Sequence, residues 1–147
     1  MKMRRQVILM LLIIALLCTS AYAENFNFEE SAADNILRSS LYINTYNASI
    51  TAESDGIVAV DTIVIGTGIM TVIGVKTLNI QKYQSGSWTT VKTYSSLYAY
   101  NSTQASSSVT YQGTAGYQYR AVVTFYASNS SGYDTRYMTT SSVIAVS

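Results

Sequence analysis

The residues that could do acid–base chemistry in this chain are carboxylates, because the sequence has no histidine and a single cysteine, Cys18. Without histidine there is no Ser-His-Asp or Cys-His nucleophile system and no imidazole metal ligand. The carboxylates beyond residue 40 are scattered: Glu53 and Asp55 in a turn-forming segment, Asp61 within an apolar run, and Asp134. A glycosidase needs two carboxylates about 5–9.5 Å apart across a cleft, and this spacing predicts no such pair. We therefore expect no enzymatic activity.

Asp134 and Arg136 are the one charged pair whose spacing suggests contact. Two residues apart on a strand, they point to the same face, which predicts a surface salt bridge worth about 0–1 kcal/mol. The same pair is a candidate recognition site. The stretch 129–134 has only part of the alternating Asp and Asn pattern of a calcium loop. Gly66-Thr-Gly68 lacks the Lys-Ser/Thr ending of a phosphate loop. We expect no metal and no cofactor.

Aromatic residues are the other candidates for a site. The segment Tyr94-Ser-Ser-Leu-Tyr98-Ala-Tyr100-Asn is expected to be the longest loop between strands, and tyrosine is favoured in recognition loops because it offers a large rigid area and a hydroxyl. The alternative is that its rings fold back and cap the edge of the sheet. The only tryptophan, Trp88, is expected to plug the core between two sheets, with an exposed ligand platform as the alternative.

The N-terminal region is typical of a secretory signal peptide. Lys2, Arg4 and Arg5 precede an apolar run over 7–18, and Ala21-Tyr-Ala23 supplies an A-x-A cleavage site. The run is shorter than the ~20 residues that span a membrane. We predict a signal peptide over 1–23, cleaved after Ala23, a flexible arm over 24–38 and a β-sandwich domain over 39–147. The protein is then secreted, and touches a membrane only through the signal peptide before cleavage.

Cleavage changes the charge of the chain. Of the nine basic residues, six remain beside all eight acidic ones, which gives a net charge of −2. A nucleic-acid-binding protein needs a concentrated basic face, so nucleic acid is excluded as a partner. Cys18 leaves with the signal peptide, and the exported, disulfide-free domain has to rely on its apolar core.

The mature chain is rich in Ser, Thr, Tyr, Val and Ile, with turn signals every 10–20 residues, which is typical of an all-β protein. We place strands at about 41–52, 57–65, 75–84, 87–95, 107–112, 117–127 and 133–145, and their number suits an immunoglobulin-like antiparallel β-sandwich. Gly66-Thr-Gly68 is expected to connect two of them through glycines with positive φ. Period-two alternation predicts these inward positions: Val58, Val60, Thr62, Val64, Leu78, Ile80, Tyr117, Tyr119, Ala121, Val123 and Phe125.

The segment Gly116-Tyr-Gln-Tyr119-Arg-Ala121 resembles the tyrosine corner of immunoglobulin and fibronectin type III sandwiches. That resemblance implies that the Tyr119 hydroxyl bonds backward to the preceding corner. Ala121 stands where an antibody domain has its second cysteine, so the likeness is to the disulfide-free fibronectin side.

Nearly the whole mature chain also resembles a family of small exported proteins, mostly from Gram-positive, clostridia-like bacteria, whose function is unknown. The matching stretches are 38–42, 66–74, 88–94, 108–126 and 132–136. This resemblance implies a signal peptide and one β-sandwich domain, and it implies no activity.

We interpret the sequence as an exported, non-enzymatic binding or interaction module whose partner is an unknown protein or glycan. The alternative is a carbohydrate- or cell-wall-binding domain that uses Trp88 or the Tyr94–Asn101 segment as its platform. A small secreted hydrolase is a third and weaker hypothesis.

The signal peptide makes the first testable prediction. The mature protein should begin at Glu24 and be soluble in the culture medium, because cleavage is expected after Ala23. Mass spectrometry of the N-terminal peptide measures this directly. An intact Met1 terminus in the membrane fraction would contradict it and make residues 7–23 an anchor.

Overall fold

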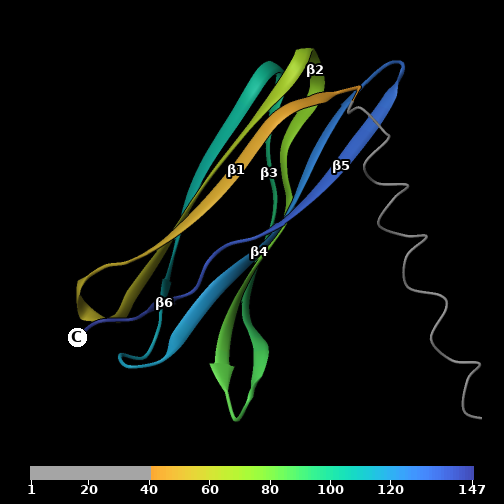
Figure 1. Cartoon of the computed structure of the whole chain (residues 1–147). Coiled ribbons are helices and arrows are strands. Elements are labelled where there is room, and N and C mark those ends of the chain that lie inside the picture. The colour runs from red at the N-terminus through yellow and green to blue at the C-terminus, as the bar shows by residue number, and fades with distance from the viewer. Residues whose placement is uncertain (1–40) are drawn as a thin grey trace, which may run out of the picture. The chain divides into compact units, whose positions relative to one another are not determined.

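A computed structural model describes residues 41–147, and these form an all-β fold (Figure 1). The strands are β1 (Ile43–Ala52), β2 (Ile57–Gln84), β3 (Ser87–Gln112), β4 (Gln118–Asn129), β5 (Gly132–Thr139) and β6 (Val143–Ile144), with a 3-10 turn η1 (Ser54–Gly56) before β2. The predicted signal peptide over 1–23 and arm over 24–38 lie outside the described residues. Within 41–147, no helix has the length and apolar character needed to cross a bilayer.

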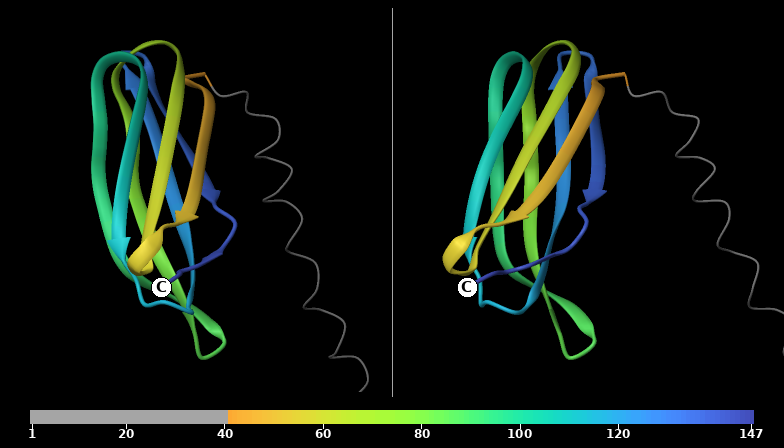
Figure 2. Two further views of the ribbon diagram at one scale, coloured as in Figure 1. Left: turned by 90° about the vertical axis from the view of Figure 1, so that its left-hand side faces the viewer. Right: turned by 60° about the vertical axis from the view of Figure 1, so that its left-hand side comes forward.

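Two long strands organise the sheet. β2 has 28 residues and β3 has 26, and they pair antiparallel along almost their whole length. The first part of β2 also pairs with β1, and its second part pairs with β4, which in turn pairs with β5 and β6. β2 and β3 lose register between Ile65 and Met70. The sheet curls, so that β1 comes to lie against β4 and β5 without pairing with them (Figure 2).

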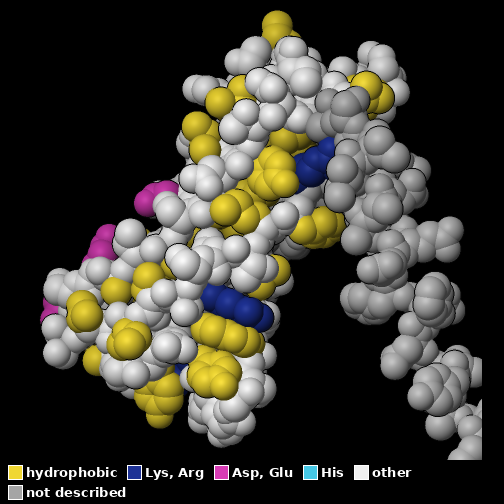
Figure 3. Space-filling view, viewed as in Figure 1, with side chains coloured by type: hydrophobic (Ala, Val, Ile, Leu, Met, Phe, Trp, Pro, Cys, Tyr) yellow, Lys and Arg dark blue, Asp and Glu magenta, His cyan; other side chains and the backbone are white. Residues whose placement is uncertain are grey.

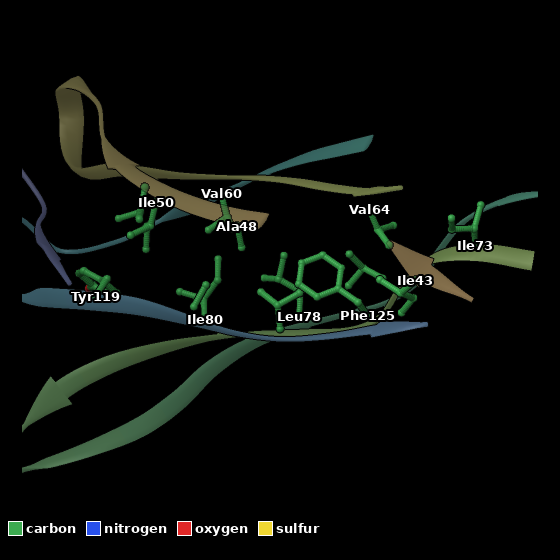
Figure 4. Close-up of a cluster of buried hydrophobic side chains, with 14 of the residues drawn as sticks. Ile43, Ala48, Ile50, Val60, Val64, Ile73, Leu78, Ile80, Tyr119 and Phe125 are labelled. Carbon is green, nitrogen blue, oxygen red and sulfur yellow. The ribbon is translucent and has the colours of Figure 1, made fainter. Parts of the chain in front are cut away.

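The core lies inside this curl. In Figure 4 the side chains of Ile50, Ala48 and Val60 face those of Tyr119, Ile80 and Leu78 across the interior. The inward positions predicted from alternation are confirmed as buried at Val58, Val60, Thr62, Val64, Leu78, Ile80, Tyr119, Ala121, Val123 and Phe125.

Tyr117 was predicted to be inward, and that was wrong. β4 begins only at Gln118, so Tyr117 belongs to the preceding loop and is 38% exposed. Its ring lies under the Lys82 ammonium, whose Nζ is 3.5 Å from the ring centroid. An exposed cation–π contact of this kind holds the ring outside the core.

Two segments that were predicted to connect strands lie within strands instead. Gly66-Thr-Gly68 lies within β2, and neither glycine has positive φ. Gly66 is needed for packing instead, because a Cβ there would lie 2.9 Å from Cγ of Met70. The Tyr94–Asn101 segment is likewise no loop, because it lies within β3 and pairs with β2. A turn signal in the sequence marks a bend of a long strand here, rather than its end.

The backward hydrogen bond expected of the Tyr119 hydroxyl is present. The buried Tyr119 hydroxyl accepts a hydrogen bond from the backbone N–H of Thr114 at 2.9 Å. Gly116 has φ +84 in the loop between them, a backbone conformation that favours glycine. Ala121 is fully buried, and its N–H donates to the Thr140 hydroxyl at 2.9 Å. These bonds tie the loop before β4 and the chain after β5 to the base of the core.

Replacing Tyr119 with Phe should therefore lower the free energy of unfolding by about 0.5–1.5 kcal/mol, since it removes one hydrogen bond and keeps the ring. Urea denaturation measures the change. Tyr100→Phe is the matched control, because it removes a phenol hydroxyl from a side chain that is 67% exposed. A Tyr119→Phe midpoint equal to that of the control would show that the hydrogen bond contributes nothing.

Candidate functional site

Five tyrosines gather on the outer surface of the curled sheet, and we call this set the tyrosine face. Its members are Tyr98 and Tyr100 of β3, Tyr126 of β4, and Tyr133 and Tyr137 of β5. Their sequence neighbours Leu97, Ala99, Phe125 and Met138 pack in or against the core. Because successive side chains of a strand point to opposite faces, the tyrosines point outward.

Three of these rings are in direct contact. The centroids of Tyr98 and Tyr126 are 6.0 Å apart, and those of Tyr126 and Tyr133 are 5.9 Å apart with an interplanar angle of 27°. Tyr126 is thereby held between two other rings. Tyr133 is 68% exposed and Tyr137 72% exposed. The face therefore combines a ring held by its neighbours, Tyr126, with rings that are largely open to solvent.

Gly74 of β2 lies between Tyr98 and Tyr126 and brings them together. Each of these tyrosines pairs with Gly74 across the sheet, so their Cα atoms are two strand spacings apart, about 10 Å. The rings can meet because the position between them carries no side chain. Gly74 has φ +151, and a Cβ there would lie 2.1 Å from the Leu97 carbonyl oxygen. No other residue fits.

The environment of Tyr98 changes its acidity. Partial burial raises the pKa of the Tyr98 phenol, and the neighbouring hydroxyls of Tyr126 and Tyr100 raise that pKa further. The folded state therefore favours the protonated phenol, which can both donate and accept a hydrogen bond.

A second aromatic group lies near the β2–β3 hairpin. Trp88 and Tyr83 are paired across it, with ring centroids 5.1 Å apart. The Arg120 guanidinium carbon lies 4.3 Å from the centroid of the Trp88 ring, and Arg120 Nε donates to Gln81 Oε1 at 2.9 Å. Figure 3 shows hydrophobic side chains clustered on the surface with Lys or Arg side chains against them. Asp and Glu side chains lie along the left margin of the same view.

Trp88 was predicted to be a core plug, and that was wrong. It is half-buried and stands outside the core cluster, two residues after the Ser85-Gly86 turn. At the end of a hairpin no opposite layer covers the ring, and Arg120 covers it instead.

The other predicted site residues are dispersed. The Tyr94 ring packs against the core, and its hydroxyl donates to the Thr110 carbonyl, so it faces away from Tyr98 and Tyr100. Asp134 Oδ2 accepts a hydrogen bond from the Tyr42 N–H at 2.8 Å, which ties β5 to the segment before β1. Arg136 alternates with Tyr137 and so points to the inner side of β5, as Asp134 does. The Asp134–Arg136 salt bridge stays a prediction. Within 41–147 there is no group of three His, Cys, Asp or Glu residues that could hold a metal.

Sequence reasoning missed three members of the tyrosine face. Alternation in 117–127 does place Tyr126 outward, and the four-residue spacing of Tyr133 and Tyr137 puts both on one face of a strand. The sequence could not predict the strand register, which pairs β4 with Gly74 of β2 and pairs β5 with β4, and so brings these tyrosines together.

Comparison of the chain with protein-family models, with curated proteins and with solved structures finds no match. The resemblance to exported Gram-positive proteins therefore stays a prediction, and the site is judged on its geometry.

The raised pKa of Tyr98 makes a prediction for alkaline solution. Its unfolded pKa is about 10 and its folded value is higher, so the protonated phenol stabilises the fold fully below pH ~10. That contribution is lost as the pH rises through the folded pKa. The fall in unfolding free energy above pH ~10 should be smaller in Tyr98→Phe than in the wild type.

Urea titrations at a series of pH values measure this difference. Tyr137→Phe is the control, since it removes a phenol that is 72% exposed. The same alkaline loss in Tyr98→Phe as in the control would contradict the assignment.

Proposed function

We propose that this protein is an exported, non-enzymatic binding module, and that the tyrosine face is its binding surface. The observation that carries this proposal is the convergence of five tyrosines on one outer surface, with Tyr100, Tyr133 and Tyr137 each about two-thirds or more exposed. An exposed aromatic cluster of this size costs solubility, so it is expected where a partner covers it.

The pairing of the strands supports an immunoglobulin/fibronectin type III-like sandwich as the frame. If β2 and β3 are each counted as two strands at their bends, seven strands result. The first layer is then β1, the first part of β2 and the last part of β3. The second is the first part of β3, the second part of β2, β4 and β5. These match the A-B-E and C-F-G neighbours of that fold, and the Tyr119 bond matches its tyrosine corner.

The chemistry of the face favours binding. Tyrosine rings bury large apolar areas while their hydroxyls keep hydrogen-bonding capacity, and they lose little conformational entropy when fixed. Tyr126 is already held by ring contacts on both sides, so part of the ordering cost is met before a ligand arrives.

The placement of the carboxylates supports a non-enzymatic role. Glu53 and Asp55 lie at the η1 turn, and Asp61 lies on the outer side of β2 between Ser49 and Ser108 of the neighbouring strands. Asp134 is bonded to the backbone of Tyr42. These four are all the side-chain carboxylates of residues 41–147, and they come from three separate parts of the sheet.

Capture by the immobilised exported chain tests this proposal. Culture medium and solubilised cell envelope from the producing organism are passed over the wild type and over a Tyr100→Ala/Tyr133→Ala double variant. The retained component should fall at least tenfold in the variant, since contact-surface tyrosines are frequent hot spots of about 2 kcal/mol. Tyr133 also contacts Tyr126, so the thermal unfolding midpoint of the double variant is measured alongside to show that the fold is kept.

Tyr117→Ala is the matched control, because it removes a tyrosine that is 38% exposed and lies outside the face. Equal retention by the double variant, the control and the wild type would contradict the proposal.

A further inference from the structure

We propose that the ligand of the tyrosine face is a neutral polysaccharide, bound as an extended chain across several sugar units. This inference rests on the proposed function, since it names the class of ligand for the same surface.

The spacing of the exposed rings calls for an extended ligand. Tyr100 and Tyr133 lie in one cross-strand row, three strands apart, which is about 14 Å between their Cα atoms. Tyr133 and Tyr137 are four residues apart on β5, which is about 13 Å. A single sugar ring cannot touch two of these platforms, whereas a chain of several units can.

The side chains between the rings fit a sugar chain. The tyrosines lie in three cross-strand rows of the sheet. The other positions of these rows, most of which bear a hydroxyl, are Val72, Ser128, Gly74, Thr135, Ser95, Thr77 and Thr124. A glycan presents apolar ring faces and many hydroxyls, so it pairs with aromatic rings set among hydroxyl-bearing residues. A protein interface is enriched in apolar contacts at its centre, and only Val72 supplies an aliphatic side chain here.

The charges of the face are few. The rows contain no carboxylate and no basic side chain, and the one cation beside them is Lys76, which is exposed on β2 at the register shift between the Gly74 row and the Thr77 row. Asp134 alternates with Tyr133 and so points to the opposite side of β5, while Arg120 is engaged with Trp88 and Gln81 nearer the β2–β3 hairpin. A polymer with an anionic group on each unit would find a single lysine to pair with, and one exposed ion pair adds little, so a neutral chain fits the face better.

Affinity electrophoresis tests the inference. The exported chain is run in native gels containing β-glucan, arabinoxylan, hydroxyethyl-cellulose or glycol-chitin, and it is sedimented with insoluble chitin and purified peptidoglycan. At least one of the neutral polysaccharides should retard or sediment the wild type, whereas binding to peptidoglycan alone, which carries carboxylates, would contradict a neutral ligand. Tyr133→Ala and Tyr100→Ala should each weaken that binding about tenfold, and Tyr117→Ala should leave it unchanged. Thermal unfolding of each variant shows whether the fold is kept.

The length of the ligand is tested by competition. An oligosaccharide of the retarding polymer long enough to span ~14 Å should displace it, and the corresponding monosaccharide should not. Displacement by the monosaccharide at the same molar concentration would overturn the extended-chain inference.

The failures of the two proposals are distinguishable. If no polysaccharide binds, but the Tyr100→Ala/Tyr133→Ala variant still loses a captured protein from the culture, the glycan inference is wrong and the proposed function stands. If a polysaccharide binds equally well to wild type, Tyr133→Ala and Tyr100→Ala, the tyrosine face is not the site and both proposals fail.

Discussion

The close approach of β3 to β2 at Gly74 is the constraint on which the rest of the structure depends. A Cβ at this position would lie 2.1 Å from the Leu97 carbonyl oxygen and 2.9 Å from Cα of Tyr98. Atoms do not approach so closely, so only glycine lets β3 pass this near to β2. The same missing side chain lets the rings of Tyr98 and Tyr126 meet above the sheet. The absence of a side chain at Gly74 thus sets both the packing of the β2–β3 hairpin and the continuity of the tyrosine face.

The core and the outer face are two sides of the same strands. Phe125 is fully buried, and the next residue, Tyr126, stands at the centre of the tyrosine face. The packing that holds Phe125 therefore fixes the backbone that carries Tyr126. Side chains carried by a packed sheet are held rigid in this way. A loop of the same residues would lose more conformational entropy when a ligand binds.

Sequence alone predicted the inner face well, because burial leaves a direct period-two signature. Asp61 correctly settled which side of β2 faces the core, and Gln118 with Arg120 did the same for β4. The Tyr119 hydrogen bond followed from a local motif only a few residues long. In each case the cause lies within one strand or one turn, so a single segment of sequence carries the whole signal.

The outer face was predicted poorly, because it depends on contacts between distant segments. Tyr94 was grouped with Tyr98 and Tyr100, yet its ring turns to the core, since the region is strand and a positive φ at Ser96 interrupts the alternation. Trp88 was placed in the core by its size, although a hairpin end offers no opposite layer. The partners of Tyr98 come from β4 and β5, and only strand register brings them together.

The most direct test of the proposed binding surface is a tyrosine-ring NMR spectrum of isotope-labelled protein, recorded before and after addition of the component retained in the capture experiment. Assigned ring signals of Tyr100, Tyr126, Tyr133 and Tyr137 should shift together, while the indole N–H of Trp88, which lies with Arg120 near the β2–β3 hairpin, should stay in place. Shifts confined to Trp88, or to the loop that contains Tyr117, would contradict the tyrosine face as the binding surface.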